Sequence, residues 1–352
     1  MKKILVINDG GSGNLGDRAI KDTLESLLRG ANCDVNWVSF TGWAGGKHSQ
    51  AAQLETRPAR WKKFVRKMLP GELRWFLKNG RMFLRHLRAC KYDLILVGGG
   101  QLIQSNHVFG PAMFIWTSLF KRFHKKKVIL IAVGVTESYS RFDRYLFGKS
   151  LKLVDDVYVR DSDSLSALKD IFGVSARVVP DVAFCINRVY EQQSQKEKRA
   201  MFCPVTYEFY KRKNDKPDIE LSYNEYLQYW IESILEYSNN DYEVKLFCMI
   251  GSDLGIAKQL KQILFDKHDV DIEILDIRTI ENLTKEIAKS EVIVSARMHA
   301  LIIGYAYGCK VVPYRTSEKI EAFEKEYIGG DICLDEVQGR IIGTVEKIAG
   351  DS

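Results

Sequence analysis

The 352-residue sequence lacks the features that mark several common protein classes. It contains no run approaching the ~18 apolar residues of a membrane span. Only four apolar residues separate Met1-Lys2-Lys3 from Asn8, which is too short for the hydrophobic region of a signal peptide. These absences predict a cytoplasmic protein that is not integral to a membrane.

Cysteine motifs and the common catalytic signatures are also missing. The seven cysteines are scattered from Cys33 to Cys333, their number is odd, and no C-x-x-C pair occurs. This pattern argues against a disulfide framework or a zinc site and predicts reduced, mostly buried thiols. No H-E-x-x-H, G-x-S-x-G or Walker sequence is present.

What the chain does have is a globular composition with an uneven charge distribution. Hydrophobic residues make up 46% and charged residues 28%, as in soluble globular proteins. The net charge is +7, yet the segment 57–91 alone holds twelve Lys or Arg and one acid, Glu72. This segment therefore makes the protein basic, because the rest of the chain is slightly acidic.

Strand and helix patterns alternate through two successive parts of the chain. In the first part, strands are expected at 3–8, 33–40, 93–97, 128–135, 157–159 and 176–179, and helices at 18–29, 112–123, 142–153 and 162–171. After a polar stretch at 187–199, strands recur at 200–205, 242–249, 271–275, 292–294 and 310–313, and helices at 222–238, 254–265, 280–289 and 299–307. A short helix from Ser317 and a final helix at 334–348 follow.

This alternation predicts parallel, doubly wound sheets of the α/β class. We expect an N-terminal Rossmann-like domain over residues 1–187, a C-terminal Rossmann-like domain over 199–334, and a C-terminal helix and tail over 335–352. Two such domains facing each other across a cleft form the GT-B architecture.

The stretch 295–300 (Ser-Ala-Arg-Met-His-Ala) follows a strand and opens a helix. Ligands of open α/β sheets bind at the carboxyl ends of strands, where a helix N-terminus favours anions. Arg297 adds a fork of donors that matches a carboxylate or phosphate. His299 adds an imidazole, which can exchange a proton near neutral pH. The pair suits a small phosphorylated acid, although a surface Arg and a structural His fit the spacing equally well.

Three further motifs allow competing interpretations. The glycines at 11, 13 and 16 match a dinucleotide-binding turn, but the second strand ends at Phe40 without the acidic residue that holds the ribose. The acids of Asp161-Ser162-Asp163 open a helix, which favours a helix cap over a metal–nucleotide site. Glu318 and Glu326 have the spacing of a glycosyltransferase motif, within a stretch that is rich in acids.

In combination, six ordered pieces resemble the polysaccharide pyruvyl transferase family. They are Asn14-Leu15-Gly16-Asp17, the 98–104 stretch Gly-Gly-Gly-Gln-Leu-Ile-Gln, Val159-Arg160-Asp161, the 180–184 stretch Pro-Asp-Val-Ala-Phe, the 295–300 stretch, and Val312-Pro313-Tyr314 followed by Lys319. They extend from the first turn to residue ~320, which is nearly the whole chain. Two positions depart from the family pattern. Gln101 occupies a position where Ser is frequent in the family, and Asn106 lies near a position where many members have Asp.

The resemblance implies a GT-B-like enzyme that transfers the enolpyruvyl group of phosphoenolpyruvate to two hydroxyls of a sugar. The product is a cyclic pyruvate ketal, and phosphate is released. The resemblance implies that Arg297 binds the donor, that Arg160 is a second guanidinium, that His299 is the acid and that Asp17 accepts a hydroxyl proton. It places the remaining substrate-binding positions at Ser295, Asn14, Gly16, Gly99, Gly100, Gln101, Tyr314 and Lys319.

We expect no metal and no cofactor, with phosphoenolpyruvate serving as the donor substrate. The expected acceptor is a sugar in a polysaccharide or in its lipid-linked precursor. The alternatives are a GT-B glycosyltransferase that uses a nucleotide sugar and a non-catalytic sugar-phosphate-binding protein of the same fold.

Aromatic residues are interleaved with the cations of the 57–91 segment. This composition has two interpretations. The segment forms solvated helices, or it forms a surface that docks on anionic membranes. Nucleic acid is not expected as a partner, because no recognised binding module accompanies the charge. With docking, the protein would be peripheral at the inner face of the cell membrane.

Overall fold

The computed structural model describes residues 1–41, 79, 91–106, 108–192, 194–213, 221–314, 318–330 and 332–350. The side chains at 213, 318 and 319 are outside this description. Apart from residues 79 and 91, the basic segment 57–91 also lies outside the described residues, so its predicted membrane-surface role stays a prediction.

The chain divides into two compact units, each made of segments that are distant in the sequence. Unit 1 consists of residues 1–12, 20–182 and 340–352, and unit 2 of residues 13–19 and 183–339. The chain therefore passes between the units within helix α1 (Leu15–Gly30) and again within helix α13 (Leu334–Gly350).

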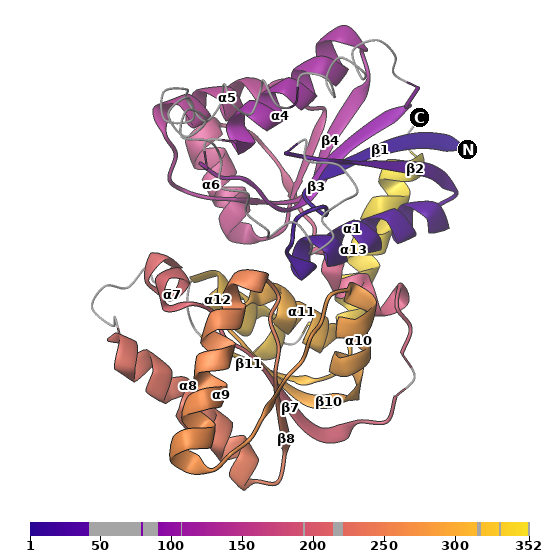
Figure 1. Cartoon of the computed structure of the whole chain (residues 1–352). Helices are drawn as coiled ribbons and strands as arrows, with labels where there is room; N and C mark the ends of the chain where they lie inside the picture. Colours follow the sequence, from indigo (N-terminus) through magenta and orange to yellow (C-terminus); the bar gives the residue numbers. More distant parts are fainter. Residues whose placement is uncertain are drawn as a thin grey trace. The chain divides into compact units, whose positions relative to one another are not determined.

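Unit 1 is built on a six-stranded parallel sheet (Figure 1). In spatial order its strands are β2 (Cys33–Ser39), β1 (Lys2–Asn8), β3 (Leu94–Ile103), β4 (Lys127–Val135), β5 (Asp156–Val159) and β6 (Arg177–Val178). Its helices, besides its parts of α1 and α13, are α4 (Phe109–Ser118), the π-helix η2 (Leu119–Phe123), α5 (Arg141–Leu151) and α6 (Ser162–Phe172). The 3-10 helix η3 (Val182–Arg188) leads from unit 1 into unit 2.

Helices α4, α5 and α6 cover one face of this sheet (Figure 1). The core between them contains alternate residues of the central strands and large side chains of the helices, including the fully buried Trp116, Phe120 and Phe147. The strands read as continuous apolar runs because helices bury both faces of a doubly wound sheet.

Unit 2 contains a five-stranded parallel sheet. In spatial order its strands are β11 (Lys310–Pro313), β10 (Ser290–Ser295), β7 (Glu197–Cys203), β8 (Glu243–Leu246) and β9 (Glu273–Ile274). Its helices are α7 (Tyr207–Lys213), α8 (Tyr223–Asn239), the 3-10 helix η5 (Gly251–Asp253), α9 (Leu254–His268), α10 (Ile280–Lys289), α11 (Met298–Ala306), α12 (Glu318–Phe323) and the π-helix η6 (Glu324–Ile328).

In each sheet the strand order reverses at one point. In unit 1, β1 connects to β2 on one side while β3 continues to β4 on the other, so the reversal lies between β1 and β3. In unit 2 it lies between β10 and β7 for the same reason. Such topological switch points create a crevice at the carboxyl ends of the strands, which is the usual ligand site of this fold.

The expected α/β architecture is confirmed, with local differences. The strand expected at 93–97 continues through residues 98–101, which belong to β3, with Gly99 at φ +76° and Gly100 at φ +80°. A Cβ on Gly99 would lie 1.9 Å from Cγ2 of Ile20, so this strand needs glycine for both its backbone angle and its packing. Asp161 caps α6 by accepting the backbone N–H of Ser164 at 2.7 Å, as expected.

Candidate active site

Three strand ends of unit 2 converge on the guanidinium of Arg297. Arg297 follows β10 and is the N-terminal cap residue of α11. Its Nε and Nη2 atoms donate to the two carboxylate oxygens of Asp253, each at 2.9 Å, and Asp253 follows β8. The guanidinium carbon lies 3.9 Å from the ring centre of Phe209 in α7, which follows β7.

This arrangement fixes the orientation of Arg297. A bidentate pair with Asp253 and stacking on an aromatic ring both restrict the planar guanidinium. Asp253 is fully buried, whereas Arg297 is half-buried. Burial raises the pKa of the Asp253 carboxyl, and the neighbouring Arg297 charge opposes that rise. One edge of the guanidinium is thus occupied by protein, so a ligand would meet Nη1 and the outer N–H of Nη2.

Ser295 and Tyr314 support the backbone at this strand end. The Ser295 hydroxyl accepts the Arg297 backbone N–H at 2.8 Å and donates to the Arg297 carbonyl at 3.1 Å. The Tyr314 backbone N–H donates to the Ser295 carbonyl at 2.8 Å. The Tyr314 side chain is buried, with its ring 4.8 Å from that of Trp230, and burial raises its pKa. The described contacts of the Tyr314 side chain are packing contacts with other aromatic rings.

His299 is brought against the first turn of α1. A Cβ added at Gly16 would lie 2.5 Å from Nδ1 of His299 and 2.6 Å from its Cγ. The imidazole therefore packs directly on the Gly16 backbone, where only glycine leaves the room. Both residues belong to unit 2, although 283 positions separate them in the sequence.

Asn14 and Leu15 anchor this turn in unit 2. The Asn14 side-chain oxygen accepts the Gly16 backbone N–H at 2.9 Å, which is an N-cap interaction of α1. The Leu15 backbone N–H donates to the carbonyl of Met249 at 3.0 Å. Asn14 is thus the cap, and the candidate base Asp17 lies within the first turn instead. Asp17 is one residue away from the contact between Gly16 and His299.

The candidate residues of unit 1 gather at its own switch point and on β5. Gly99, Gly100 and Gln101 occupy the carboxyl end of β3. The amide Nε2 of Gln101 is buried and has no hydrogen-bond partner among the described residues. Arg160 follows β5 and is buried, with its guanidinium 3.1 Å from Asp161 and 3.8 Å from Asp181.

Lys319 belongs to α12, but its side chain lies outside the described residues. Within the described part of the chain, no group of three or more His, Cys, Asp or Glu side chains is arranged to hold a metal ion. No described helix is long and apolar enough to span a membrane.

The family model of the polysaccharide pyruvyl transferases matches residues 14–318. The chain belongs to the polysaccharide pyruvyl transferase family. The match begins at Asn14, the cap of α1, and includes β3, the switch point of unit 2 and the turn at 295–300. No curated protein matches the sequence.

Solved structures share the architecture of this family member at low sequence identity. UDP-GlcNAc 2-epimerase from Neisseria meningitidis, bound to UDP-GlcNAc, aligns over 100% of this chain and 95% of its own, with 12% identity and a TM-score of 0.54. The epimerase from Methanocaldococcus jannaschii aligns over 100% and 94%, with 14% identity and a TM-score of 0.51. An alpha-glucosyltransferase in complex with UDP aligns over 100% and 92%, with 9% identity and a TM-score of 0.52. These likenesses establish the GT-B fold class, with two Rossmann-like domains.

Sequence reasoning missed Asp253 and Phe209. Asp253 ends the stretch Gly251-Ser252-Asp253, which follows the strand expected at 242–249 and lies beyond the end of β8, so its place after a strand was a usable signal. Phe209 lies in the seven-residue helix α7, which has no periodic apolar pattern to predict it.

Proposed function

We propose that this transferase moves the enolpyruvyl group of phosphoenolpyruvate to two hydroxyls of a sugar acceptor, forming a pyruvate ketal. The observation that carries the proposal is the joint placement of Arg297 and His299 at the N-terminus of α11 in a chain of this family. Phosphoenolpyruvate holds a carboxylate and a phosphate close together, and it needs fixed cationic donors and a helix N-terminus.

The proposed roles follow from the chemistry of the enol phosphate. His299 protonates the methylene carbon, and the cationic centre that forms at the neighbouring carbon is attacked by one sugar hydroxyl, whose proton passes to Asp17. The second hydroxyl then attacks the same carbon and closes the ketal, while the bond from this carbon to the phosphate oxygen breaks and the proton of the second hydroxyl leaves with the phosphate. The position of Asp17 beside the contact between Gly16 and His299 supports an acid and a base that act on one substrate.

Arg297 binds the anionic donor with the donors that Asp253 leaves free, and the pair with Asp253 holds it in place. Arg160 is the proposed second guanidinium. Ser295 and Tyr314 support the Arg297 backbone, while Gly99, Gly100 and Gln101 belong to the acceptor side. The buried Gln101 amide supports this assignment, because it offers a donor to a sugar hydroxyl.

The acceptor is a polysaccharide sugar or its lipid-linked precursor, and the segment 57–91 contributes to docking at an anionic membrane surface.

The test is phosphate release from phosphoenolpyruvate with a panel of sugar acceptors. We expect release only when an acceptor is present, together with a product whose mass increases by one pyruvyl group. His299→Gln keeps a hydrogen bond but removes the transferable proton, so turnover should fall by ~10²–10⁴-fold. Acceptor-dependent consumption of a nucleotide sugar, without phosphate release from phosphoenolpyruvate, would instead identify a glycosyltransferase. Binding of either donor without turnover would identify a sugar-phosphate-binding protein.

A further inference from the structure

The solvent-exposed side of helix α5 is made only of cations and aromatic rings. Its exposed positions from residue 141 to residue 152 are Arg141, Phe142, Arg144, Tyr145, Lys149 and Lys152. At 100° per residue these positions lie within one face of the helix. Phe142 is 51% exposed and Tyr145 60% exposed, which is unusual for large rings on a soluble protein.

The one acid of this helix does not reach that face. Asp143 is buried and accepts hydrogen bonds from the hydroxyls of Ser140, at 3.0 Å, and of Ser105. No acid on α5 therefore offsets its exposed cations.

Exposed cations and an exposed aromatic ring also occur on the neighbouring helical segment. Helix α4 packs beside α5 (Figure 1). The sequence from Leu94 to Thr136 contains no Asp or Glu, and the exposed acids next to α5 are Glu137 before it and Asp155 after it, which pairs with Lys121 of η2. The end of η2 exposes Arg122, Lys125 and Phe123, whose exposed fraction is 68%. We call the exposed residues of α5 together with those at the end of η2 the α5 face.

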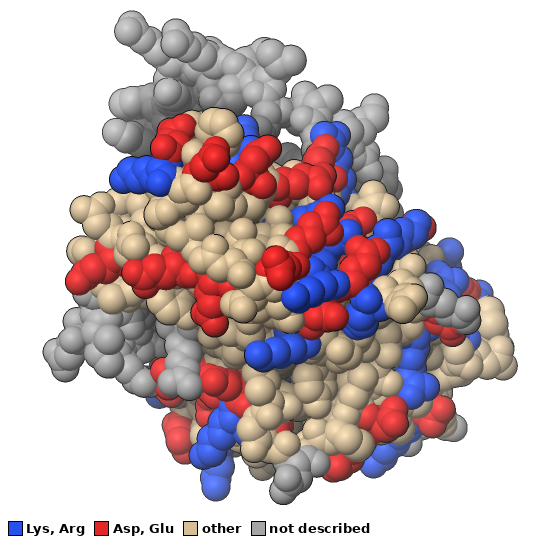
Figure 2. Space-filling view, turned by 90° about the horizontal axis from the view of Figure 1, so that it is seen from below, with Lys and Arg blue, Asp and Glu red and all other residues tan. Residues whose placement is uncertain are grey.

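Other described surfaces do not share this composition. The exposed residues of α6, on the other side of α5, include Asp163 and Asp170 as well as Lys169. Helix α9 exposes Phe265 together with Asp266 and Lys267. The side of the molecule drawn in Figure 2 likewise has blue and red side chains interspersed. A face of cations and aromatic rings is thus a local feature of α5 and η2.

We propose that the α5 face docks this protein on the surface of an anionic lipid bilayer. The negative surface potential of such a bilayer attracts the cations of the α5 face. Phe and Tyr rings insert at the boundary between headgroups and acyl chains. The basic segment 57–91 of the same chain is a poor occupant of the face, because its own net charge is strongly positive. An acidic protein partner would match the charge, but it is a separate case that the experiment distinguishes.

The proposal does not depend on the reaction, because lipid binding needs neither donor nor acceptor. We expect the purified chain to sediment with vesicles that contain about one-third phosphatidylglycerol in phosphatidylcholine, and not with pure phosphatidylcholine vesicles. Raising the salt concentration should weaken sedimentation, because the attraction is between charges at an exposed surface. A wild-type chain that ignores the anionic vesicles at low salt would overturn the proposal and leave an acidic protein as the partner to seek.

Matched variants test the site itself. The triple variant Arg141→Glu, Arg144→Glu, Lys149→Glu should lower the partition coefficient by at least ~100-fold. The control Lys258→Glu, Lys267→Glu, Lys347→Glu makes the same change in net charge at exposed positions elsewhere and should reduce binding much less. If the two triple variants lose binding equally, only the total charge matters and the α5 face is not the docking surface. If the α5 variant binds as the wild type does, the proposal is also wrong.

A second pair of variants tests the contribution of the aromatic rings to lipid binding. Phe142→Ser with Tyr145→Ser should weaken binding to anionic vesicles, whereas Phe265→Ser on α9, with a similarly exposed ring, should not. Activity on a soluble acceptor should be unchanged in all of these variants. This arm separates a failure of lipid docking from a failure of the proposed pyruvyl transfer.

Discussion

At the scale of single residues, the contact between Gly16 and His299 links the two ends of the family match. The sequence identifies both residues through motif resemblance, but it assigns Gly16 to substrate binding. In the structure the absence of a side chain at position 16 makes room for the imidazole. The candidate acid is thus positioned by a glycine on a distant part of the chain, and no local pattern around residue 16 encodes this pairing.

Gly16→Ala should impair turnover by displacing His299. The added methyl group would overlap the imidazole, so the ring must move, and a shift of about 1 Å can cost ~10²-fold in rate. Helix stability should not suffer from the exchange itself, since Ala is the better helix former. The measurement is steady-state kinetics with phosphoenolpyruvate and an active acceptor, together with thermal unfolding.

Gly13→Ala is the matched control. A Cβ at Gly13 would meet no atom within 4 Å, so turnover should stay near that of the wild type. Equal activity of the two variants would show that the position of His299 is not limiting. A Gly16→Ala chain that unfolds at a much lower temperature would show that the contact serves the fold instead.

At the scale of elements, the periodic segments were predictable and the short irregular ones were not. Helix α10 has the expected bounds, because its apolar positions recur at helical spacing. Helix α11 is displaced by one residue; it is apolar nearly all round, as expected for a buried helix. Helix α7 was not anticipated, since its aromatic residues pack against neighbouring tyrosines without such a period. Strand β3 extends beyond its expected end at residue 97, because its two positive-φ glycines continue the strand although such glycines are typical of turns.

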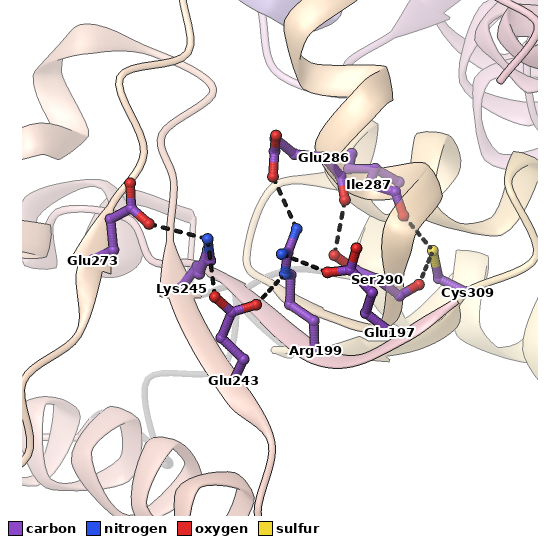
Figure 3. A network of polar contacts seen from close by, with 9 residues as sticks. All are labelled: Glu197, Arg199, Glu243, Lys245, Glu273, Glu286, Ile287, Ser290 and Cys309. Carbon is purple, nitrogen blue, oxygen red and sulfur yellow. Dashed lines mark hydrogen bonds and ion pairs between the residues drawn. The ribbon is translucent and has the colours of Figure 1, made fainter. Parts of the chain in front are cut away.

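The strands of unit 2 are joined near their amino-terminal ends by an ion-pair network (Figure 3). Arg199 of β7 is buried and pairs with Glu197 at 2.5 Å, Glu243 at 2.6 Å and Glu286 at 2.9 Å. Lys245 of β8 pairs with Glu243 at 3.1 Å and with Glu273 of β9 at 3.0 Å. The network connects β7, β8, β9 and α10 through charged side chains.

Arg199→Ala should lower the free energy of unfolding by about 1–3 kcal/mol, because it leaves three carboxylates without their shared partner. The estimate is below that for a fully buried pair, since solvent screens the partly exposed glutamates. Urea unfolding at neutral pH measures this change. Lys285→Ala, which breaks only the surface pair with Glu281, is the control and should cost less than about 0.5 kcal/mol.

The same network predicts a dependence of stability on acid. Burial raises the pKa of Glu243, but hydrogen bonds from Arg199 and Lys245 outweigh burial and leave its pKa below the ordinary 4.5. A lowered pKa means that Glu243 stabilises the fold above about pH 4.5 and that this contribution is lost as the pH falls further. The loss should be smaller in Arg199→Ala. Parallel curves for the two proteins between about pH 5.5 and about pH 3 would contradict this assignment, because the contribution is lost below the ordinary pKa of 4.5.

At the scale of the whole molecule, the sequence predicts two alternating α/β halves, but not how the chain is shared between them. Residues 13–19 group with unit 2 through contacts such as that of Leu15 with Met249, and residues 340–352 group with unit 1. Hydrophobic periodicity marks the helices α1 and α13, yet it carries no information on which sheet each turn of a helix packs against.

The C-terminal helix α13 should therefore be required for unit 1 to fold. Val337, Ile341, Val345 and Ile348 recur at helical spacing and are almost fully buried. The Lys2 ammonium, at the start of β1, donates to the carbonyls of Ile348 and Ala349 at 3.3 and 3.2 Å and thus binds the negative end of the helix dipole. Ile341→Ala should cost ~2–5 kcal/mol, because it leaves a cavity in a fully buried position.

Removal of residues 340–352 deletes three of these buried side chains together, a loss comparable with the ~5–15 kcal/mol of a typical domain. We expect this truncated chain to be insoluble or to lose the cooperative unfolding of unit 1 in calorimetry. Glu346→Ala, at an exposed position of the same helix, is the matched control and should unfold as the wild type does. A soluble truncated chain with unchanged calorimetric transitions would show that unit 1 is complete without α13, and that its last turns are an appendage.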